Sequence, residues 1–70
     1  MAATRVTNKL RAFRFNAGEM TQQQLADRSG LTRQTIIAIE QSKYAPSLEA
    51  AFRIARVFDA PLESVFGYDG

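Results

Sequence analysis

Residues 20–36 read MTQQQLADRSGLTRQTI, and this stretch contains the starts of two helices separated by a break. Thr21 is typical of a helix N-cap, and Gln24 three residues later completes a capping box. Gly30 breaks the first helix, because glycine readily takes the left-handed conformation found just past helix ends. Thr32 then caps the second helix. The two predicted helices end near Ser29 and Gln41.

Apolar residues around the break indicate how the two helices pack. Met20 and Leu25 are spaced as a hydrophobic staple for the first helix, and Leu31 with Ile36 for the second. A small residue is needed where the helices cross closely, and Ala26 stands four residues before the glycine. A generic helical hairpin could use the same caps but does not require a small residue and a glycine at this four-residue spacing. The residues expected to fix the turn and lock the helices together are Ala26, Gly30, Leu31, Ile36 and Ile39.

The rest of the chain has the periodicity of three more helices. Residues 7–17 form the first of them, on the stripe Val6, Leu10, Phe13 and Ala17, and Gly18 ends it. Ser47 caps another helix. Its inward side is expected to carry Leu48, Ala51, Phe52, Ala55 and Phe58.

A short last helix opens with Pro61 at its first position. Residues 66–68 could continue as a strand paired with residues 4–6. We therefore expect an all-α fold: a five-helix bundle that contains a helix-turn-helix, with or without a short pair of terminal strands. At 70 residues the chain is expected to be one domain over residues 1–70.

Composition excludes several classes of function. The chain contains no cysteine and no histidine, so disulfides, thiolate metal sites and imidazole bases are absent. Its carboxylates are scattered, and we expect no enzyme, no catalytic residue, no metal site and no cofactor. No apolar run is long enough for a membrane span, and the segment Met1 to Thr4 lacks the apolar region of a secretory signal. The expected location is the cytoplasm, at the nucleoid when bound to DNA.

The charges are unevenly distributed, although the net charge is only +2. Residues 1–14 contain four basic residues and no acid, and residues 59–70 contain three acids and no base. This polarity suits a protein that presents one end to a polyanion. It equally fits a solvated surface with chance segregation.

The motif, with the pieces that follow it, resembles the Cro/C1-type (phage repressor, Xre-like) helix-turn-helix family of compact single-domain regulators. The resemblance covers about residues 8–66. It rests on residues 20–36 and on Ile39-Glu40, Lys43-Tyr44, Pro46-Ser47-Leu48 and Ile54-Ala55. It implies a five-helix bundle, operator binding as a dimer and no cofactor for DNA binding. Two departures are Glu19, an extra residue in the turn, and Ser29, where an apolar residue is commoner.

The second helix of such a motif lies in the major groove of DNA. With Ile36 facing inward, four outward residues are expected to contact bases: Arg33, Gln34, Ile37 and Ala38. Arg33 can bond guanine and Gln34 can bond adenine, each through two hydrogen bonds. Ile37 and Ala38 could meet thymine methyl groups. Ile37 could also be a solitary apolar residue on the surface.

Phosphate contacts are expected beside these positions. The resemblance assigns one to Gln22, at the start of the first helix of the motif. Thr32 and Thr35 are further candidates at the start of the second, and Lys43 and Tyr44 follow its end. Tyr44 could instead pack over the turn.

The resemblance also pairs Arg14 with Glu40 as a structural ion pair, against the alternative of two independent surface charges. A last surface is predicted from four apolar residues near the end of the chain. They are more than a short final helix needs to cover the core of a single chain: Leu62, Val65, Phe66 and Tyr68. We expect them to form the dimer interface, the alternative being that Val65 and Phe66 simply close the bundle.

These expectations converge on a sequence-specific, double-stranded-DNA-binding transcriptional regulator. The expected mode is a repressor that binds a palindromic operator as a homodimer, with no membrane or small-molecule partner evident. The alternative is an antitoxin-type interaction module, which would bind both DNA and a toxin.

Overall fold

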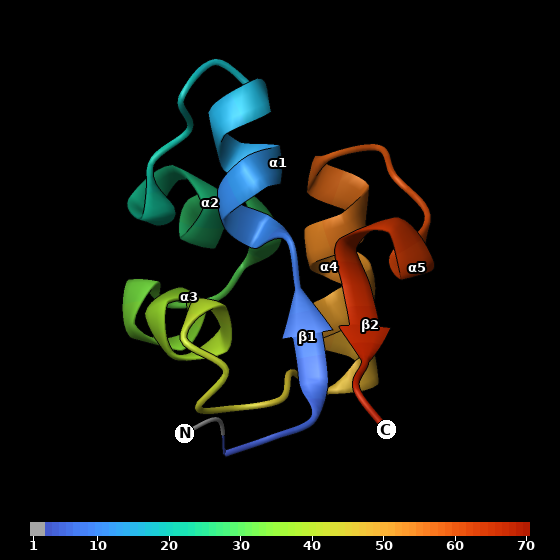
Figure 1. Cartoon of the computed structure of the whole chain (residues 1–70). Helices are drawn as coiled ribbons and strands as arrows, with labels where there is room; N and C mark the ends of the chain where they lie inside the picture. Colours follow the sequence, from blue (N-terminus) through green and yellow to red (C-terminus); the bar gives the residue numbers. More distant parts are fainter. Residues whose placement is uncertain (1–2) are drawn as a thin grey trace.

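The computed structural model describes residues 3–70, which form five helices and one two-stranded sheet (Figure 1). Met1 and Ala2, part of the segment expected to lack a secretory signal, lie outside the described residues. The predicted mostly helical fold with a terminal strand pair is confirmed. In chain order the elements are β1 (Val6–Asn8), α1 (Leu10–Asn16), α2 (Gln22–Ser29), α3 (Arg33–Glu40), α4 (Leu48–Val57), α5 (Leu62–Val65) and β2 (Phe66–Tyr68).

Local hydrogen bonds at the helix ends follow the sequence closely. The Thr21 hydroxyl accepts from the backbone N–H of Gln24, whose side chain accepts from the N–H of Thr21, so the capping box is complete. The hydroxyls of Thr32 and Ser47 likewise accept from the backbone N–H groups of Thr35 in α3 and Ala50 in α4. Gly30 has φ 73° and ends α2 in the left-handed conformation, which explains why glycine stands there.

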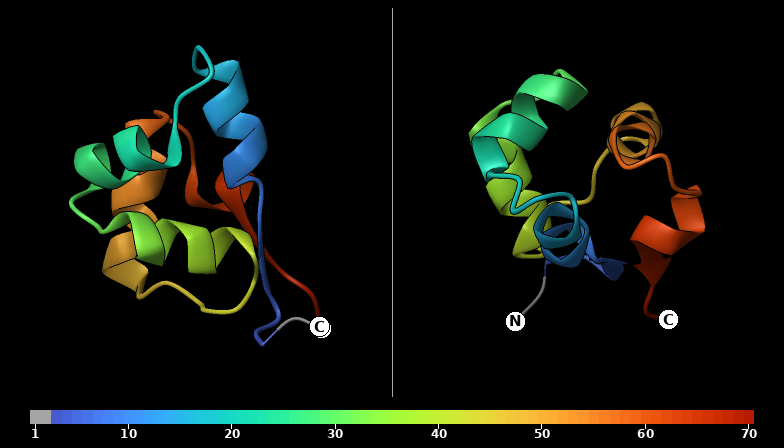
Figure 2. Two further views of the ribbon diagram at one scale, coloured as in Figure 1. Left: turned by 90° about the vertical axis from the view of Figure 1, so that its left-hand side faces the viewer. Right: turned by 90° about the horizontal axis from the view of Figure 1, so that it is seen from above.

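The core lies where α2, α3 and α4 meet, closed by α1 and α5 (Figure 2). Ser29, the unusual polar residue on α2, is buried with them, and its hydroxyl donates to the carbonyl of Leu25 at 2.7 Å. That bond satisfies the hydroxyl inside the core. The core side chains are Leu10, Met20, Leu25, Ala26, Ile36, Ile39, Ile54, Ala55 and Val65.

The first helix starts later than predicted. Residues 6–8 form β1, so the helix expected from residue 7 begins at Leu10. The Asn8 carboxamide oxygen accepts from the N–H of Leu10 at 3.1 Å, a local turn that competes with helix. The strand pair is antiparallel, with Thr7 opposite Gly67. β1 therefore starts two residues later than the predicted segment 4–6, whereas β2 coincides with the predicted segment 66–68. A Cβ on Gly67 would lie 2.8 Å from the Thr7 hydroxyl, so glycine permits this close pairing.

The predicted inward face of α4 is partly wrong. Ala51 and Ala55 are buried as expected, but Leu48 and Phe52 are 67% and 50% exposed. The buried face instead centres on Ile54 and small alanines, which allow α4 to lie close to its neighbours. Phe58, half-buried at the helix end, packs against Phe13 with ring centroids 5.3 Å apart.

The last helix differs from the prediction in one detail. Pro61 is the residue before α5 rather than its first helical residue, with ψ 151°. Among residues 3–70, none of the helices has both the length and the apolar character needed to cross a membrane.

Candidate nucleic-acid interface

Helix α3 presents one face to the core and another to solvent. Ile36 and Ile39 are buried, as their spacing predicts. On the other face, Arg33 and Gln34 are exposed, while Ile37 and Ala38 are intermediate. The left view of Figure 2 shows α2 and α3 one above the other, with the short turn between them at the edge of the molecule. The outer side of α3 is therefore accessible along its first turn.

The start of α3 is held by its threonines. The Thr32 hydroxyl accepts from the N–H of Thr35, and the two hydroxyl oxygens are 2.9 Å apart. This cap occupies the N–H of Thr35 and leaves the backbone N–H groups of Arg33 and Gln34 free of a helical partner, as at any helix start. Free N–H groups at a helix start are donors for a phosphate oxygen.

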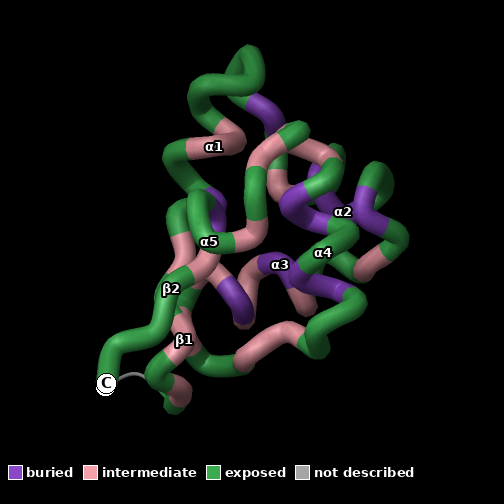
Figure 3. Tube along the Cα trace, turned by 90° about the vertical axis from the view of Figure 1, so that its right-hand side faces the viewer, coloured by how far each residue is buried: buried purple, intermediate pink, exposed green. Residues whose placement is uncertain are grey.

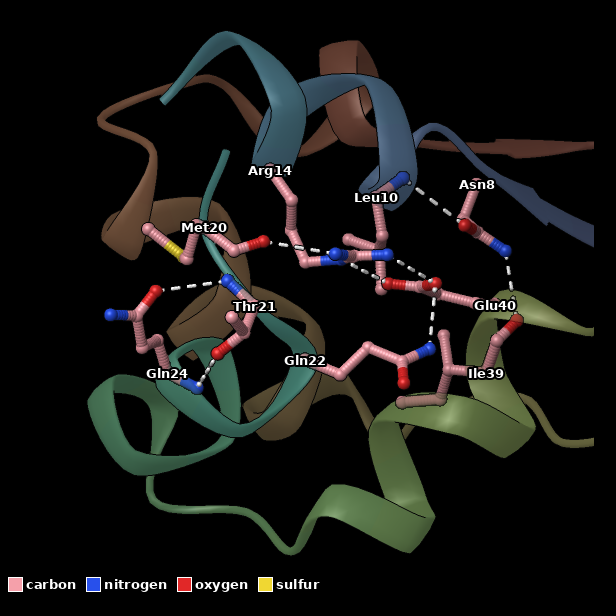
Figure 4. Close-up of polar contacts among 9 residues, drawn as sticks. All are labelled: Asn8, Leu10, Arg14, Met20, Thr21, Gln22, Gln24, Ile39 and Glu40. Carbon is pink, nitrogen blue, oxygen red and sulfur yellow. Dashed lines mark hydrogen bonds and ion pairs between the residues drawn. The ribbon is translucent and has the colours of Figure 1, made fainter. Parts of the chain in front are cut away.

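A partly buried ion pair fixes the other end of α3 to α1 (Figure 4). Arg14 Nε and Nη2 donate to the two carboxylate oxygens of Glu40 at 2.7 and 2.9 Å. A third bond from Arg14 Nη1 reaches the carbonyl of Met20 at 2.9 Å. The side chains are only 15% and 10% exposed, so this is a two-pronged pair within the fold. The predicted pairing of Arg14 with Glu40 is present.

The same carboxylate holds Gln22, which the sequence did not suggest. Gln22 Nε2 donates to Glu40 Oε1 at 3.2 Å. Because a carboxylate only accepts, the amide nitrogen must face Glu40 and the orientation of the carboxamide is determined. Gln22, the expected phosphate contact at the start of α2, is thereby tied to the end of α3.

Asn8 is a second residue that sequence reasoning missed. Its Nδ2 donates to the carbonyl of Ile39 at 2.8 Å, while its oxygen accepts from the N–H of Leu10, the first residue of α1. One side chain therefore connects β1, α1 and the last turn of α3 (Figure 4). An asparagine two residues before a helix is a recognisable turn signal. Its bond to α3 spans 31 residues and has no local signature.

Basic side chains lie beside this network. Lys9 and Arg11 line an open groove together with Arg14, Gln22 and Gln41. The groove adjoins the start of α2 and the end of α3, and its lining also contains Glu19 and Glu40. Because Glu40 is paired with Arg14, Lys9 and Arg11 leave the groove with a small excess of positive charge.

The segment after α3 is held against the N-terminal part of the chain. The backbone N–H of Ala3 donates to the carbonyl of Ser42 at 2.9 Å. Lys43 and Tyr44, which follow, are both exposed. Tyr44 is not packed into the core as its alternative interpretation required.

The predicted dimer surface requires a correction. Val65 is 1% exposed and belongs to the core of the single chain, so it is not available to a partner. Leu62 and Phe66 are half-buried against the same core, and Tyr68 is exposed. Val65 is buried because α5 directs this side chain toward the core, where it packs with the other core residues.

Comparisons with known proteins agree with this geometry. A family model described as helix-turn-helix matches residues 10–65. An uncharacterized helix-turn-helix-type transcriptional regulator of Archaeoglobus fulgidus is 48% identical over 61 residues, covering 87% of this chain and 86% of the relative. A similarly described protein of Bacillus subtilis is 41% identical over 59 residues, covering 84% and 88%. The chain belongs to the helix-turn-helix family of transcriptional regulators.

A solved structure shows the same fold. The restriction-modification controller protein C.AhdI from Aeromonas hydrophila aligns with this helix-turn-helix protein at a TM-score of 0.70 and 30% identity. The alignment covers 77% of this chain and 80% of the controller protein. The family consists of DNA-binding regulators rather than enzymes, so α2 and α3 are its DNA-binding motif.

Of the two departures from the family pattern, the structure accounts for both locally. Glu19 has φ 58° and follows Gly18 at φ 79°, so the turn between α1 and α2 contains two consecutive left-handed residues. Ser29 is satisfied inside the core. Neither residue lies on the outer side of α3 in this helix-turn-helix protein.

Proposed function

We propose that this helix-turn-helix protein is a transcriptional repressor that binds a palindromic operator in double-stranded DNA as a homodimer. The observation that carries the proposal is the exposed pair Arg33 and Gln34 on the first turn of α3, a helix anchored at its far end by Arg14 and Glu40. A rigid helix with hydrogen-bonding side chains at its start is suited to reading base edges.

In this proposal the outer side of α3 lies in the major groove. Arg33 donates to guanine O6 and N7, and Gln34 bonds adenine N6 and N7. Ile37 and Ala38, which are partly exposed, meet thymine methyl groups. These four side chains specify the half-site.

Phosphate contacts orient the helix. Gln22 keeps its second amide hydrogen after bonding Glu40, and that hydrogen can reach a phosphate at the start of α2. Thr32 and Thr35 contribute at the start of α3, and Lys43 and Tyr44 hold the backbone beyond its end. Lys9 and Arg11 beside α1 add attraction that does not depend on base sequence.

Two copies are needed because one helix reads too few bases to identify a unique site. A two-fold dimer reads two half-sites about one helical turn apart. The predicted contact surface, without the buried Val65, consists of Leu62, Phe66 and Tyr68. A dimer bound over a promoter would exclude other proteins from it, which is the basis for proposing repression.

The test is selection of bound sequences from a random double-stranded DNA pool, followed by footprinting on the protein's own promoter region. We expect enrichment of a two-fold symmetric site with half-sites about one turn apart, and lower transcription from the footprinted promoter. Gln34→Ala should change the selected base at one position of each half-site. Arg56→Ala serves as the control, because Arg56 is an exposed arginine of α4 outside the motif. Enrichment of no sequence, or of a site without symmetry, would contradict the proposal.

A further inference from the structure

The exposed side of α4 carries two large apolar side chains that the fold does not use. Leu48 and Phe52 are four residues apart, so they lie one above the other on the same face of the helix. We call this pair the α4 stripe. Each keeps at least half of its surface accessible in the single chain, in a helix whose buried face is otherwise complete. Two adjacent apolar side chains of this size form a patch that a second surface could remove from water.

The position of the α4 stripe around the helix follows from its neighbours. A Cβ on Gly30 would lie 3.3 Å from Arg53 Nη1, so Arg53 leans over the turn between α2 and α3. In Figures 1 and 2, α2 and α5 lie on opposite sides of α4. At 100° per residue the α4 stripe is at the far edge of the exposed arc from Arg53, which is the edge toward α5. Figure 3 looks onto the side of the molecule that carries α5 and β2.

The order of residues along α4 makes this face complementary to itself. If two copies of α4 pack antiparallel about a two-fold axis that crosses the α4 stripe at the level of residue 50, Leu48 of one copy faces Phe52 of the partner subunit, and the reverse contact is identical. Such reciprocal contacts define an isologous interface. A parallel arrangement, with its two-fold axis along the helices, would place Leu48 on Leu48 and the charged flanks of the two copies on opposite sides of the interface.

The charges beside the stripe favour the same arrangement. Glu49 and Arg53 form an exposed pair at 2.7 Å, with side chains 76% and 52% exposed. A two-fold axis perpendicular to the helix pair keeps both charges on the same side of the interface. Glu49 then lies beside Arg53 of the partner subunit, offset along the helix by two residues, or about 3 Å. The acid at the start of α4 and the base near its end are therefore complementary only to an antiparallel copy.

The geometry points to a homodimer contact centred on the α4 stripe, with Glu49 and Arg53 as its charged border and a second copy of this chain as its occupant. The contact adjoins the surface of Leu62, Phe66 and Tyr68 on α5 and β2. It deepens the proposed function, because it rests on the homodimer proposed there and specifies how the two copies meet.

Equilibrium sedimentation of the full chain tests the apolar part. Phe52→Ala should raise the dimer dissociation constant at least about tenfold, as expected for a buried aromatic anchor, and Leu48→Ala should act in the same direction. Phe15→Ala is the matched control, because Phe15 on α1 is as exposed as Leu48 but lies outside the proposed contact. Far-ultraviolet circular dichroism checks that each variant folds. An unchanged constant for folded Phe52→Ala would overturn the inference.

Charge reversal tests the antiparallel register independently. Glu49→Arg gives a copy with two positive side chains at this border, and Arg53→Glu gives a copy with two negative ones. Each variant alone should dimerise more weakly than the wild type, because like charges then meet across the axis. A mixture of the two variants should form a heterodimer at least about tenfold tighter than either homodimer. No preference for the heterodimer would overturn the register.

These outcomes are distinguishable from failure of the proposed function. If the wild type binds a two-fold operator as a dimer and Phe52→Ala still dimerises normally, the contact is wrong and the repressor proposal stands. If the charge-reversed mixture pairs as expected but the wild type binds no DNA, the contact stands and the proposed function fails.

Discussion

Removing the Glu40 carboxylate while leaving Arg14 in place should strongly destabilise this protein. In Glu40→Leu, Arg14 loses two charged hydrogen bonds, at 2.7 and 2.9 Å, and remains with its side chain only 15% exposed. Hydrogen bonds to charged groups contribute about 1.5–3 kcal/mol each, and breaking one partner of a buried pair costs about 3–5 kcal/mol. We expect a loss of about 3–4 kcal/mol, because Arg14 keeps its bond to the Met20 carbonyl.

That loss is a large fraction of the total stability. At roughly 0.05–0.15 kcal/mol per residue, a chain of 70 residues has a free energy of unfolding of about 4–10 kcal/mol. The double variant Arg14→Met/Glu40→Leu leaves no unpaired buried charge, so it should be more stable than Glu40→Leu alone. The two positions should therefore be strongly coupled.

Urea-induced unfolding, followed by far-ultraviolet circular dichroism at one fixed protein concentration, measures these differences. Asp27→Ala is the control, because Asp27 is exposed on α2, lies outside the proposed contacts and accepts only an exposed side-chain bond from Gln23 at 2.9 Å. Its removal should cost less than about 0.5 kcal/mol. The reasoning is refuted if Glu40→Leu costs no more than Asp27→Ala, or if the losses of the two single variants simply add in the double variant.

Three further predictions concern the turn and the DNA contacts. Gly30→Val should unfold or badly destabilise the protein, because φ is 73° at this position and a β-branched residue resists that conformation. The control Gly18→Ala, at φ 79° with open space around its Cβ, should cost only about 1–2 kcal/mol. Thermal melts compare the two variants, and a stable Gly30→Val would show that the turn is misplaced. Gln34→Ala and Arg33→Ala should each reduce the binding free energy on the best DNA site by about 1–3 kcal/mol and relax specificity at one base pair. Competition with single-base variants of the site measures this, and equal weakening on every sequence would contradict base contact. Affinity should fall steeply with salt, and Lys43→Ala should reduce the slope of log K against log salt by about 0.9, read from titrations at several salt concentrations; a flat response would remove the DNA hypothesis.

Much of the motif was predictable because its determinants are local. Thr21 with Gln24, Thr32 and Ser47 each act within three residues of a helix start. The left-handed Gly30 is likewise an intrinsic property of one residue. Such interactions are the same wherever the helix lies in the fold, so they can be inferred without knowing the neighbours.

The site was predictable only in part. Arg33 and Gln34 are exposed as expected, because the inward positions of Ile36 and Ile39 determine which face of α3 remains outside. The bond from Gln22 to Glu40 joins residues 18 apart. Its existence depends on how α2 crosses the end of α3, which no local pattern contains.

By itself, then, the sequence determined where the helices of the motif begin and end, the glycine turn between them and the accessible face of α3. Only the tertiary structure decided that Leu48 and Phe52 face outward on α4, that Val65 is buried under α5, and that residues 6–8 are a strand. Two apolar stripes overlap on α4, and periodicity cannot separate them. The face with the small alanines is the buried one, because small side chains let neighbouring elements pack closely against α4. That packing depends on where those elements lie, which only the tertiary structure determines.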